Sequence, residues 1–188
     1  MIFRELLEQD FSSKATALEQ VPATYKEKSF DFNNCDILDY GCGKGLGKKY
    51  CETNFEDCKV YNYDPYNGFN EINLFISSKG YNKVICCNNV LNVINSDLSE
   101  ILTDIRNIAD TTNTRKIIFK IYEGNGSGVG KQTGKDQYQR NMKTAEYVPI
   151  IQKIFSSYSV KKKGLYIICE SWLLSMFGCI IETRSTSL

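Results

Sequence analysis

Residues 37–45 read Ile37-Leu38-Asp39-Tyr40-Gly41-Cys42-Gly43-Lys44-Gly45, and this stretch decides the fold. A short apolar run ends in an acid, and three alternating glycines follow. Such a pattern is typical of a buried parallel strand that enters a tight turn, because glycine tolerates positive φ and leaves room for a ligand to approach the backbone. We therefore expect a strand over about 36–40 and a ligand-binding turn at 41–45.

A second strand-like run, over about 59–63, ends in Asp64, which lies 19 residues after Gly45. We expect a helix between the two runs, over about 46–54. Two adjacent strands, with a glycine turn on the first and a carboxylate at the tip of the second, make a nucleoside pocket at the carboxyl edge of an open α/β sheet.

Strands and helices continue to alternate along the chain. Further strands are expected at 83–87 and 115–122, and alternating Ile72, Leu74 and Ile76 favour a short strand within 69–82. Ser96-Asp97 is expected to cap a helix that stops at 111–113.

A later helix carries apolar residues from Tyr147 to Phe155, and Pro149 fits only in its first turn. The runs 158–160 and 165–169 suggest a closing hairpin. Together these elements predict an α/β, Rossmann-like, mostly parallel doubly wound sheet with an antiparallel C-terminal edge hairpin.

The length of 188 residues favours a single domain, with residues 1–34 as an N-terminal helical cover and 35–188 as the α/β core. Short helices are expected over 2–7 and from Ser12-Ser13 to Leu18. Lys14, Thr16 and Tyr25 of this leader face either the ligand edge or, as the more common case, solvent.

Composition excludes several classes of chemistry. The sequence has no histidine, so neither a Ser-His-Asp triad nor a histidine-ligated metal site can form. Its eight cysteines include no CxxC pair, and we predict no metal. We interpret them as small apolar residues of a reduced, cytoplasmic protein, since the N-terminus has no signal-peptide pattern.

A net charge of +1 gives the protein no global attraction to nucleic acid or membrane, although a local basic groove is compatible with it. The apolar stretch 172–181 is far shorter than the ~20 residues that span a bilayer. We therefore predict no membrane association. The sequence does not indicate an oligomeric state.

The glycine spacing differs from that of a dinucleotide-binding fingerprint, because the third glycine comes one residue early. Asp39 would also repel a pyrophosphate, whereas it suits an ammonium or a sulfonium. Asp64 suits the two hydroxyls of a ribose. An adenosine with a cationic amino-acid tail is S-adenosylmethionine, which we predict as the cofactor.

A second glycine-rich stretch, Ser127-Gly128-Val129-Gly130-Lys131, partly matches a P-loop. The match fails at Asn125, where a glycine is needed, and at Gln132, where a Ser or Thr would bind magnesium. A nucleotide-binding protein that uses the 124–133 loop therefore stays as a lesser alternative. A catalytically silent S-adenosylmethionine-binding module is another.

At these residues the chain resembles class I S-adenosylmethionine-dependent methyltransferases, over about residues 36–156. Residues 39–45 match their first motif, and Asp64 matches their ribose-binding acid. Residues 38–45, 63–66 and 90–94 together are similar to methyltransferases associated with DNA phosphorothioation and to small phage-type methyltransferases.

The resemblance implies a role for each matched residue. The turn motif, with Asp39, Tyr40, Gly41, Cys42 and Gly43, would hold the methionine moiety, and Asp64 the ribose. Pro65 and Tyr66 would pack on the adenine, or else are a turn proline and a surface tyrosine. Asn88 and Asn89 would border the methyl group.

The methyl acceptor stays open, with nucleic acid as one candidate. Methyltransferases that modify DNA amino groups carry (Asp/Asn/Ser)-Pro-Pro-(Tyr/Phe) where this chain has residues 88–91, Asn-Asn-Val-Leu. Cys87 also lacks the proline of a cytosine-C5 nucleophile. The acceptor region is predicted near Asn88, Asn89 and the glycine-rich loop 123–141, where Glu123 and Tyr138 are the candidates to accept a proton.

Overall fold

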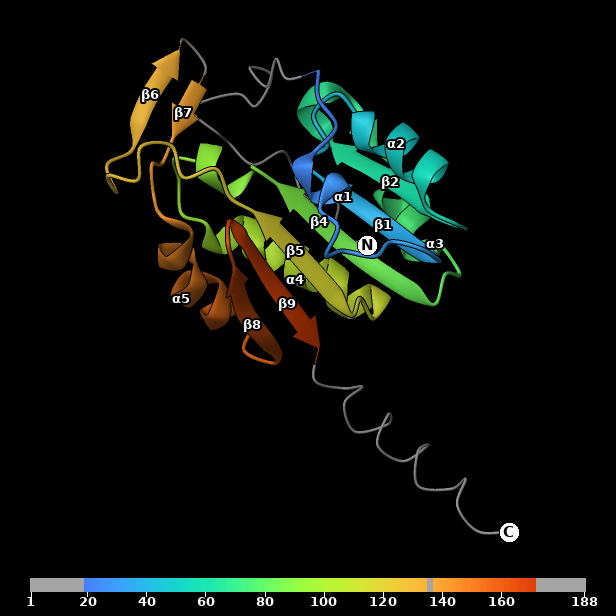
Figure 1. The fold of residues 1–188 in the computed structure, drawn as a ribbon. Helices are drawn as coiled ribbons and strands as arrows, with labels where there is room; N and C mark the ends of the chain where they lie inside the picture. The colour runs from blue at the N-terminus through green and yellow to red at the C-terminus, as the bar shows by residue number, and fades with distance from the viewer. Residues whose placement is uncertain (1–18, 135–136, 172–188) are drawn as a thin grey trace.

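The computed structural model describes residues 19–134 and 137–171. Its centre is a seven-stranded sheet of order β3-β2-β1-β4-β5-β9-β8 (Figure 1). The strands are β1 (Cys35–Tyr40), β2 (Lys59–Asp64), β3 (Phe69–Asn70), β4 (Asn82–Asn88), β5 (Lys116–Lys120), β8 (Tyr158–Lys163) and β9 (Tyr166–Ser171). β1, β2, β4 and β5 pair in parallel, β3 and β9 run against them, and β8 runs against β9. The predicted α/β fold with a mostly parallel sheet is therefore confirmed.

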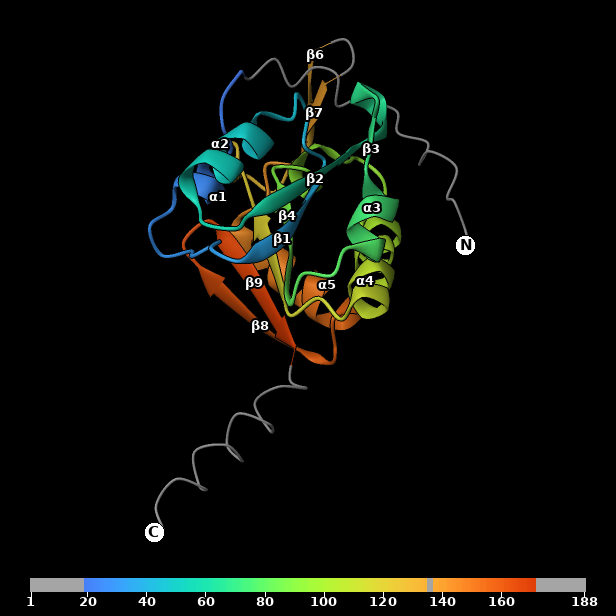
Figure 2. The ribbon, with the colours of Figure 1, turned by 90° about the vertical axis from the view of Figure 1, so that its right-hand side faces the viewer.

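Helices cover both faces of this sheet (Figure 2). They are α1 (Ala23–Lys26), α2 (Leu46–Asn54), α3 (Ile72–Ser77), α4 (Ser99–Thr112) and α5 (Thr144–Ile154). Side chains of α1 and α2 join one apolar cluster, and those of α3, α4 and α5 join the other. The two clusters are the two layers of the core.

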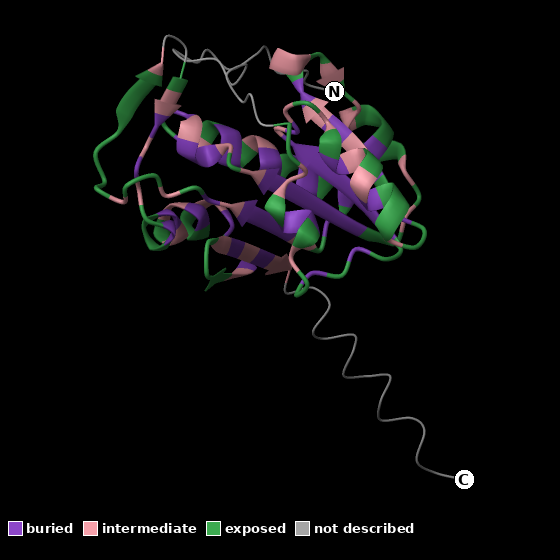
Figure 3. Cartoon of the chain, turned by 45° about the horizontal axis from the view of Figure 1, so that its top comes forward, coloured by how far each residue is buried: buried purple, intermediate pink, exposed green. Residues whose placement is uncertain are grey.

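β1 lies at the middle of the core, and all six of its residues are buried (Figure 3). Ile37 faces the α2 layer and Leu38 faces the α4 layer. A strand covered on both faces needs apolar side chains in both directions, which explains the unbroken apolar run in the sequence.

Several predicted elements are confirmed with close boundaries. The helix after the glycine turn is α2, the strand expected at 83–87 is β4, and the closing hairpin is β8–β9. β9 lies between β5 and β8, so the hairpin forms the antiparallel edge of the sheet. The seven cysteines among the described residues are free and buried, as small apolar residues would be.

The short strand predicted from Ile72, Leu74 and Ile76 is wrong, because this stretch forms helix α3. The inward-facing residues are Ile72 and Phe75, which are three apart, whereas Leu74 and Ile76 are exposed. A spacing of three is helical, so the alternation in the sequence was misleading.

Two helix starts also differ from the prediction. α4 begins at Ser99, because the Asp97 carboxylate accepts hydrogen bonds from the backbone N–H and the hydroxyl of Ser99. α5 begins at Thr144, whose N–H donates to Glu123 at 2.6 Å. Pro149 therefore lies in the second turn and not in the first.

The long glycine-rich loop contains a small hairpin of its own, β6 (Lys131–Gly134) and β7 (Gln137–Gln139). It projects from the end of the molecule where β1 and β4 finish, and most of its residues are exposed (Figures 1 and 3).

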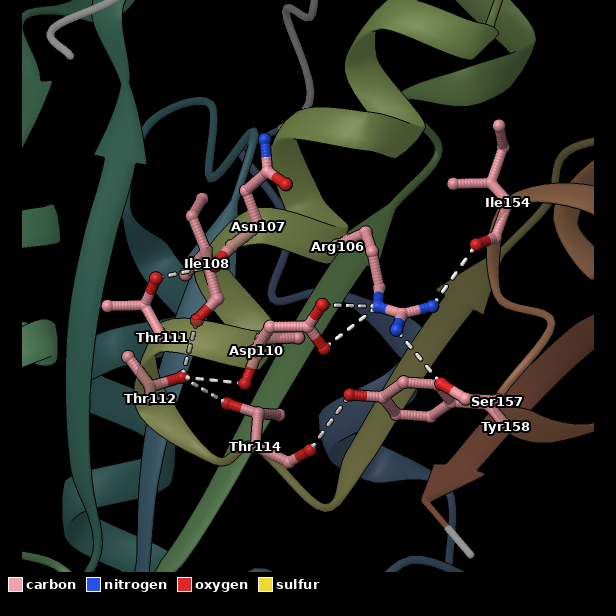
Figure 4. Close-up of polar contacts among 11 residues, drawn as sticks. Arg106, Asn107, Ile108, Asp110, Thr111, Thr112, Thr114, Ile154, Ser157 and Tyr158 are labelled. Carbon is pink, nitrogen blue, oxygen red and sulfur yellow. Dashed lines mark hydrogen bonds and ion pairs between the residues drawn. The ribbon is translucent and has the colours of Figure 1, made fainter.

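At the opposite end, Arg106 joins α4 to the start of β8 (Figure 4). Its guanidinium donates to Asp110, to the Ile154 carbonyl and to the Ser157 hydroxyl. This network fixes the layer of α4 and α5 far from the glycine turn.

In the described part of the chain, no helix combines the length and apolarity needed to cross a bilayer. The helices predicted at 2–7 and 12–18, with Lys14 and Thr16, and the apolar stretch 172–181 lie outside the described residues.

Candidate functional site at the carboxyl edge

The order of the strands singles out one edge of the sheet. From β1 the chain moves outward to β2 and β3, and then returns past β1 to β4 and β5. In open α/β sheets, ligands bind outside the carboxyl ends of the strands at such a reversal. The glycine turn and both predicted acids lie at this edge.

The turn after β1 depends on its glycines. Gly41 has φ +76°, and a Cβ there would overlap the Val90 side chain. Gly43 also has positive φ, +57°, but no atom lies within 4 Å of a Cβ position. The turn is thus closed toward β4 at Gly41 and open at Gly43, which leaves backbone accessible to a ligand.

Asp64 ties the tip of β2 to this turn. One carboxylate oxygen accepts from the Gly43 N–H at 2.9 Å, and the other accepts from the Asn67 N–H at 3.2 Å. A carboxylate can accept about four hydrogen bonds, so both oxygens keep further capacity. Pro65 is exposed beside it, and burial followed by the charge of Asp64 raises the pKa of the half-buried Tyr66.

Asp39 is fully buried at the end of β1. Burial raises its pKa to about 7, the nearby polar groups of Asn88 and Tyr25 oppose that rise, and the charge of Asp64 adds to it. Asn88 Nδ2 donates to Asp39 Oδ1 at 3.3 Å. The Tyr25 hydroxyl and Asp39 Oδ2 are both buried, and neither has a hydrogen-bond partner among the described residues. We therefore regard Oδ2 as a free acceptor.

Thr24 and Tyr25 of helix α1 close the site from one side. The Thr24 hydroxyl donates to Asn88 Oδ1, and both Thr24 and Tyr25 are buried. The expectation that Tyr25 faces solvent is therefore wrong. The role of Thr24 carries no signal in the sequence, because it arises only when the leader folds onto β4.

The acids have no cationic partner among the described residues. No ion pair found there includes Asp39 or Asp64. The Cys42 thiol lies near both carboxylates, and burial, then Asp39, then Asp64 raise its pKa. The edge thus holds two acidic side chains without a described cationic partner, and a bound cation would favour the charged form of Asp39.

The other predicted residues lie in different surroundings. The Tyr40 hydroxyl donates to Asp104 of α4 at 2.7 Å, on the other face of the sheet. Asn89 is exposed with φ +56°, and its N–H donates to the Lys120 carbonyl. It is therefore next to Asn88 but outside the hydrogen bonds that join Asn88 to Thr24 and Asp39.

Glu123 and Tyr138 both lie near Tyr147 of α5. Glu123 caps α5, and its hydrogen bonds from Thr144 lower its pKa. That disfavours proton uptake by Glu123 at neutral pH. Tyr138 is half-buried on β7, against Gly130. Within the described ranges, the hydrogen bonds of Glu123 join it to α5 and not to the acids of the glycine turn.

Asn92 connects the hairpin to the site. Its side chain donates to Gln139 at 3.1 Å, and its carbonyl accepts from the Arg140 N–H at 2.8 Å. The Arg140 guanidinium also donates to the carbonyls of Ile94 and Ser96. The segment 90–96 therefore contacts the glycine turn through Val90 and holds the β6–β7 hairpin through Asn92.

Comparison of the chain with models of protein families, with curated proteins and with solved structures finds no match.

Proposed function

We propose that this chain is a class I S-adenosylmethionine-dependent methyltransferase. One observation carries the proposal: two buried carboxylates, Asp39 and Asp64, end adjacent parallel strands on either side of an open glycine turn, without a described cationic partner. The mostly parallel order of β2, β1, β4 and β5, closed by the antiparallel β8–β9 hairpin, is compatible with it.

The residues present fit S-adenosylmethionine. Asp39 Oδ2 is a buried acceptor without a completed hydrogen bond, suited to the cationic amino-acid end of the molecule. Asp64 retains acceptor capacity for a ribose diol, beside Pro65 and Tyr66 for the adenine. The cofactor itself supplies a methyl group already activated on sulfonium.

The contribution of the protein would then be positioning. Asn88, fixed by Thr24, would border the methyl group, and the β6–β7 hairpin, fixed by Asn92, would flank the acceptor. In-line transfer needs the acceptor atom aligned and close, and holding it there lowers the barrier without a covalent intermediate. The free, buried cysteines are compatible with the cytoplasmic location that we propose.

Calorimetric titration with S-adenosylmethionine tests the proposal. We expect the wild type to bind and Asp64→Ala to lose about 10–100-fold in affinity, because hydrogen bonds to a charged acceptor are strong. Asp64→Asn keeps an acceptor for the Gly43 N–H and checks that the turn survives. Asp31→Ala, at an exposed acid, is the matched control. Folded wild-type protein that does not bind S-adenosylmethionine would overturn the proposal.

A screen with tritiated methyl donor across DNA, RNA, proteins and small molecules separates an enzyme from a silent binding module. Cofactor binding without transfer to any of these acceptors would favour the module.

The P-loop alternative receives no support from the local geometry. Lys131 begins strand β6, whereas a P-loop lysine stands at the start of a helix whose N–H groups face the phosphates. Magnesium-dependent ATP binding that disappears in Lys131→Ala would revive this alternative.

A further inference from the structure

One part of the sheet lacks a helical layer on one side. On β5, β9 and β8, the residues Ile167 and Cys169 face α4 and α5 and are buried. The opposite face of these strands is turned toward the viewer in Figure 1, and no described helix lies across it. α1 and α2 cover the neighbouring strands instead, and Phe30 reaches this face, with its ring centre 5.2 Å from that of Tyr166 and 6.0 Å from Lys163 Nζ.

This uncovered face is rich in lysine. The pairing register places Lys116 and Lys120 of β5, and Lys161 and Lys163 of β8, on the same side as Tyr166 of β9. We call these four lysines the lysine face. Lys120 Nζ lies 5.2 Å from the centre of the Tyr166 ring, which confirms the shared side.

Protection of a sheet edge explains the two lysines on β8 but not the two on β5. β8 is an edge strand, where lysines hinder pairing with other chains. β5, in contrast, lies between β4 and β9 and needs no such protection. Burial lowers the pKa of Lys120, whose ammonium donates to the Ile121 carbonyl and lies over the Tyr166 ring, so edge protection does not account for this lysine. Lys120 therefore calls for another explanation.

Acidic side chains compensate part of the charge on this face, since Glu123 acts on Lys120 and Glu27 lies near Tyr166. Glu170 pairs with Lys116 at 3.4 Å. Lys120, Lys161 and Lys163 form no ion pair with any described residue. The surface thus presents several ammonium groups on a flat sheet, which suits a ligand with regularly repeated negative charge.

The lysine face adjoins the proposed methyl-transfer position. Lys120 is the register partner of Asn88, and the Asn89 N–H donates to the Lys120 carbonyl at 2.8 Å. A polyanion lying across the lysines would therefore reach Asn88. The face offers few apolar side chains for insertion into lipid, which disfavours a membrane surface as the partner.

We propose that the lysine face binds the phosphate backbone of a nucleic acid and that nucleic acid is the methyl acceptor. Phosphate contacts fix the position of a nucleic acid without reading its sequence, and they make binding depend on salt. The identity of the acceptor rests on the methyltransferase function proposed above, whereas binding itself does not.

Fluorescence anisotropy with a labelled 20-nucleotide probe tests binding without cofactor, using single-stranded and duplex forms of DNA and RNA. The test variant is Lys161→Gln/Lys163→Gln, and the matched control is Lys49→Gln/Lys153→Gln, at exposed lysines of α2 and α5. We expect the test variant to bind at least one of these forms about tenfold more weakly, with the slope of log affinity against log salt reduced by ~2, and the control to match the wild type.

Three results would overturn the proposal: no binding of any probe by the wild type, equal weakening in both double variants, or stronger binding to anionic vesicles or an acidic peptide than to nucleic acid. Titration of the same proteins with S-adenosylmethionine separates the two proposals. Cofactor binding without nucleic-acid binding refutes only this inference. Nucleic-acid binding without cofactor binding refutes the methyltransferase function and leaves the lysine face in place.

Discussion

The two halves of the carboxyl edge carry opposite charge. At the tips of β1 and β2, buried carboxylates lie beside an open backbone turn with no described cation. From the tip of β5 across β9 to β8, the surface carries four lysines, of which Lys116 pairs with Glu170 and Lys120 feels the charge of Glu123. Asn88 on β4 stands between the two halves, bonded to Asp39 and paired in register with Lys120.

This difference suggests a division of labour. A cationic adenosyl ligand suits the acidic half, and an anionic acceptor suits the basic half, so the two would meet at Asn88. The two sets of charges also differ in desolvation free energy, because the acids are buried and the lysines are mostly solvated. Changes in the acidic half should therefore alter stability most.

The largest effect on the unfolding free energy is expected from Asp39→Asn. Because burial raises the pKa of Asp39 from 3.8 to about 7, the folded state binds this proton more tightly than the unfolded chain does. Its contribution to stability is fully present below pH 3.8 and is lost as the pH rises through 7, by about 4 kcal/mol.

Urea unfolding at pH 4 and at pH 8 measures this difference. Between these two values we expect the unfolding free energy of wild type to fall by about 4 kcal/mol more than that of Asp39→Asn. Asp31→Asn, at an exposed acid, should follow the wild type. Parallel pH profiles for wild type and Asp39→Asn would show that Asp39 is not held in a desolvated site.

The next largest loss of stability is expected from a substitution in the glycine turn. In Gly41→Ala, positive φ and overlap with Val90 together should cost about 3 kcal/mol of stability. In Gly43→Ala only positive φ is penalised, at about 1 kcal/mol, because the Cβ meets open space. Equal losses in urea unfolding would contradict the asymmetry of the turn.

These two halves were not equally predictable. Gly41, Asp39 and Asp64 stand at strand ends, so their local spacing already indicated a nucleoside site. The lysine face exists only through the register of β5, β9 and β8, whose residues lie far apart in the sequence. Thr24 and Tyr25 likewise reach Asp39 and Asn88 only through tertiary packing.

The incorrectly predicted ends and types of helices also result from contacts between residues far apart in the sequence. α5 begins at Thr144 because Glu123, 21 residues earlier in the chain, accepts its N–H. α3 is helical because Ile72 and Phe75 together face the core, which a count of alternating apolar residues does not detect. Local pattern thus gave the order of the elements, and long-range contacts set their ends.

The anchor of the hairpin should produce a smaller, local effect. Asn92→Ala leaves the buried Gln139 side chain without its donor, which should cost about 2 kcal/mol. Hydrogen exchange should accelerate in residues 124–134 and 137–142, while affinity for S-adenosylmethionine stays unchanged. Asn73→Ala, at an exposed position on α3, is the control. Uniform acceleration throughout the protein would argue against a local anchor.

The smallest effect is expected from Tyr40→Phe. Its hydroxyl bonds Asp104 on the face away from Asp39, so we expect a loss of about 1 kcal/mol in stability and unchanged cofactor affinity. Tyr81→Phe, at a tyrosine that is 93% exposed, provides the comparison. Weaker cofactor binding in Tyr40→Phe would instead place this hydroxyl in the pocket.

The charge of the bound adenosine ligand tests the central claim most directly. Side-by-side calorimetry of the wild type with S-adenosylmethionine, NAD and magnesium–ATP compares a cationic tail with two anionic ones at the same pocket. We predict that S-adenosylmethionine binds and that the other two do not. Binding of NAD or ATP in the absence of S-adenosylmethionine binding would contradict the account.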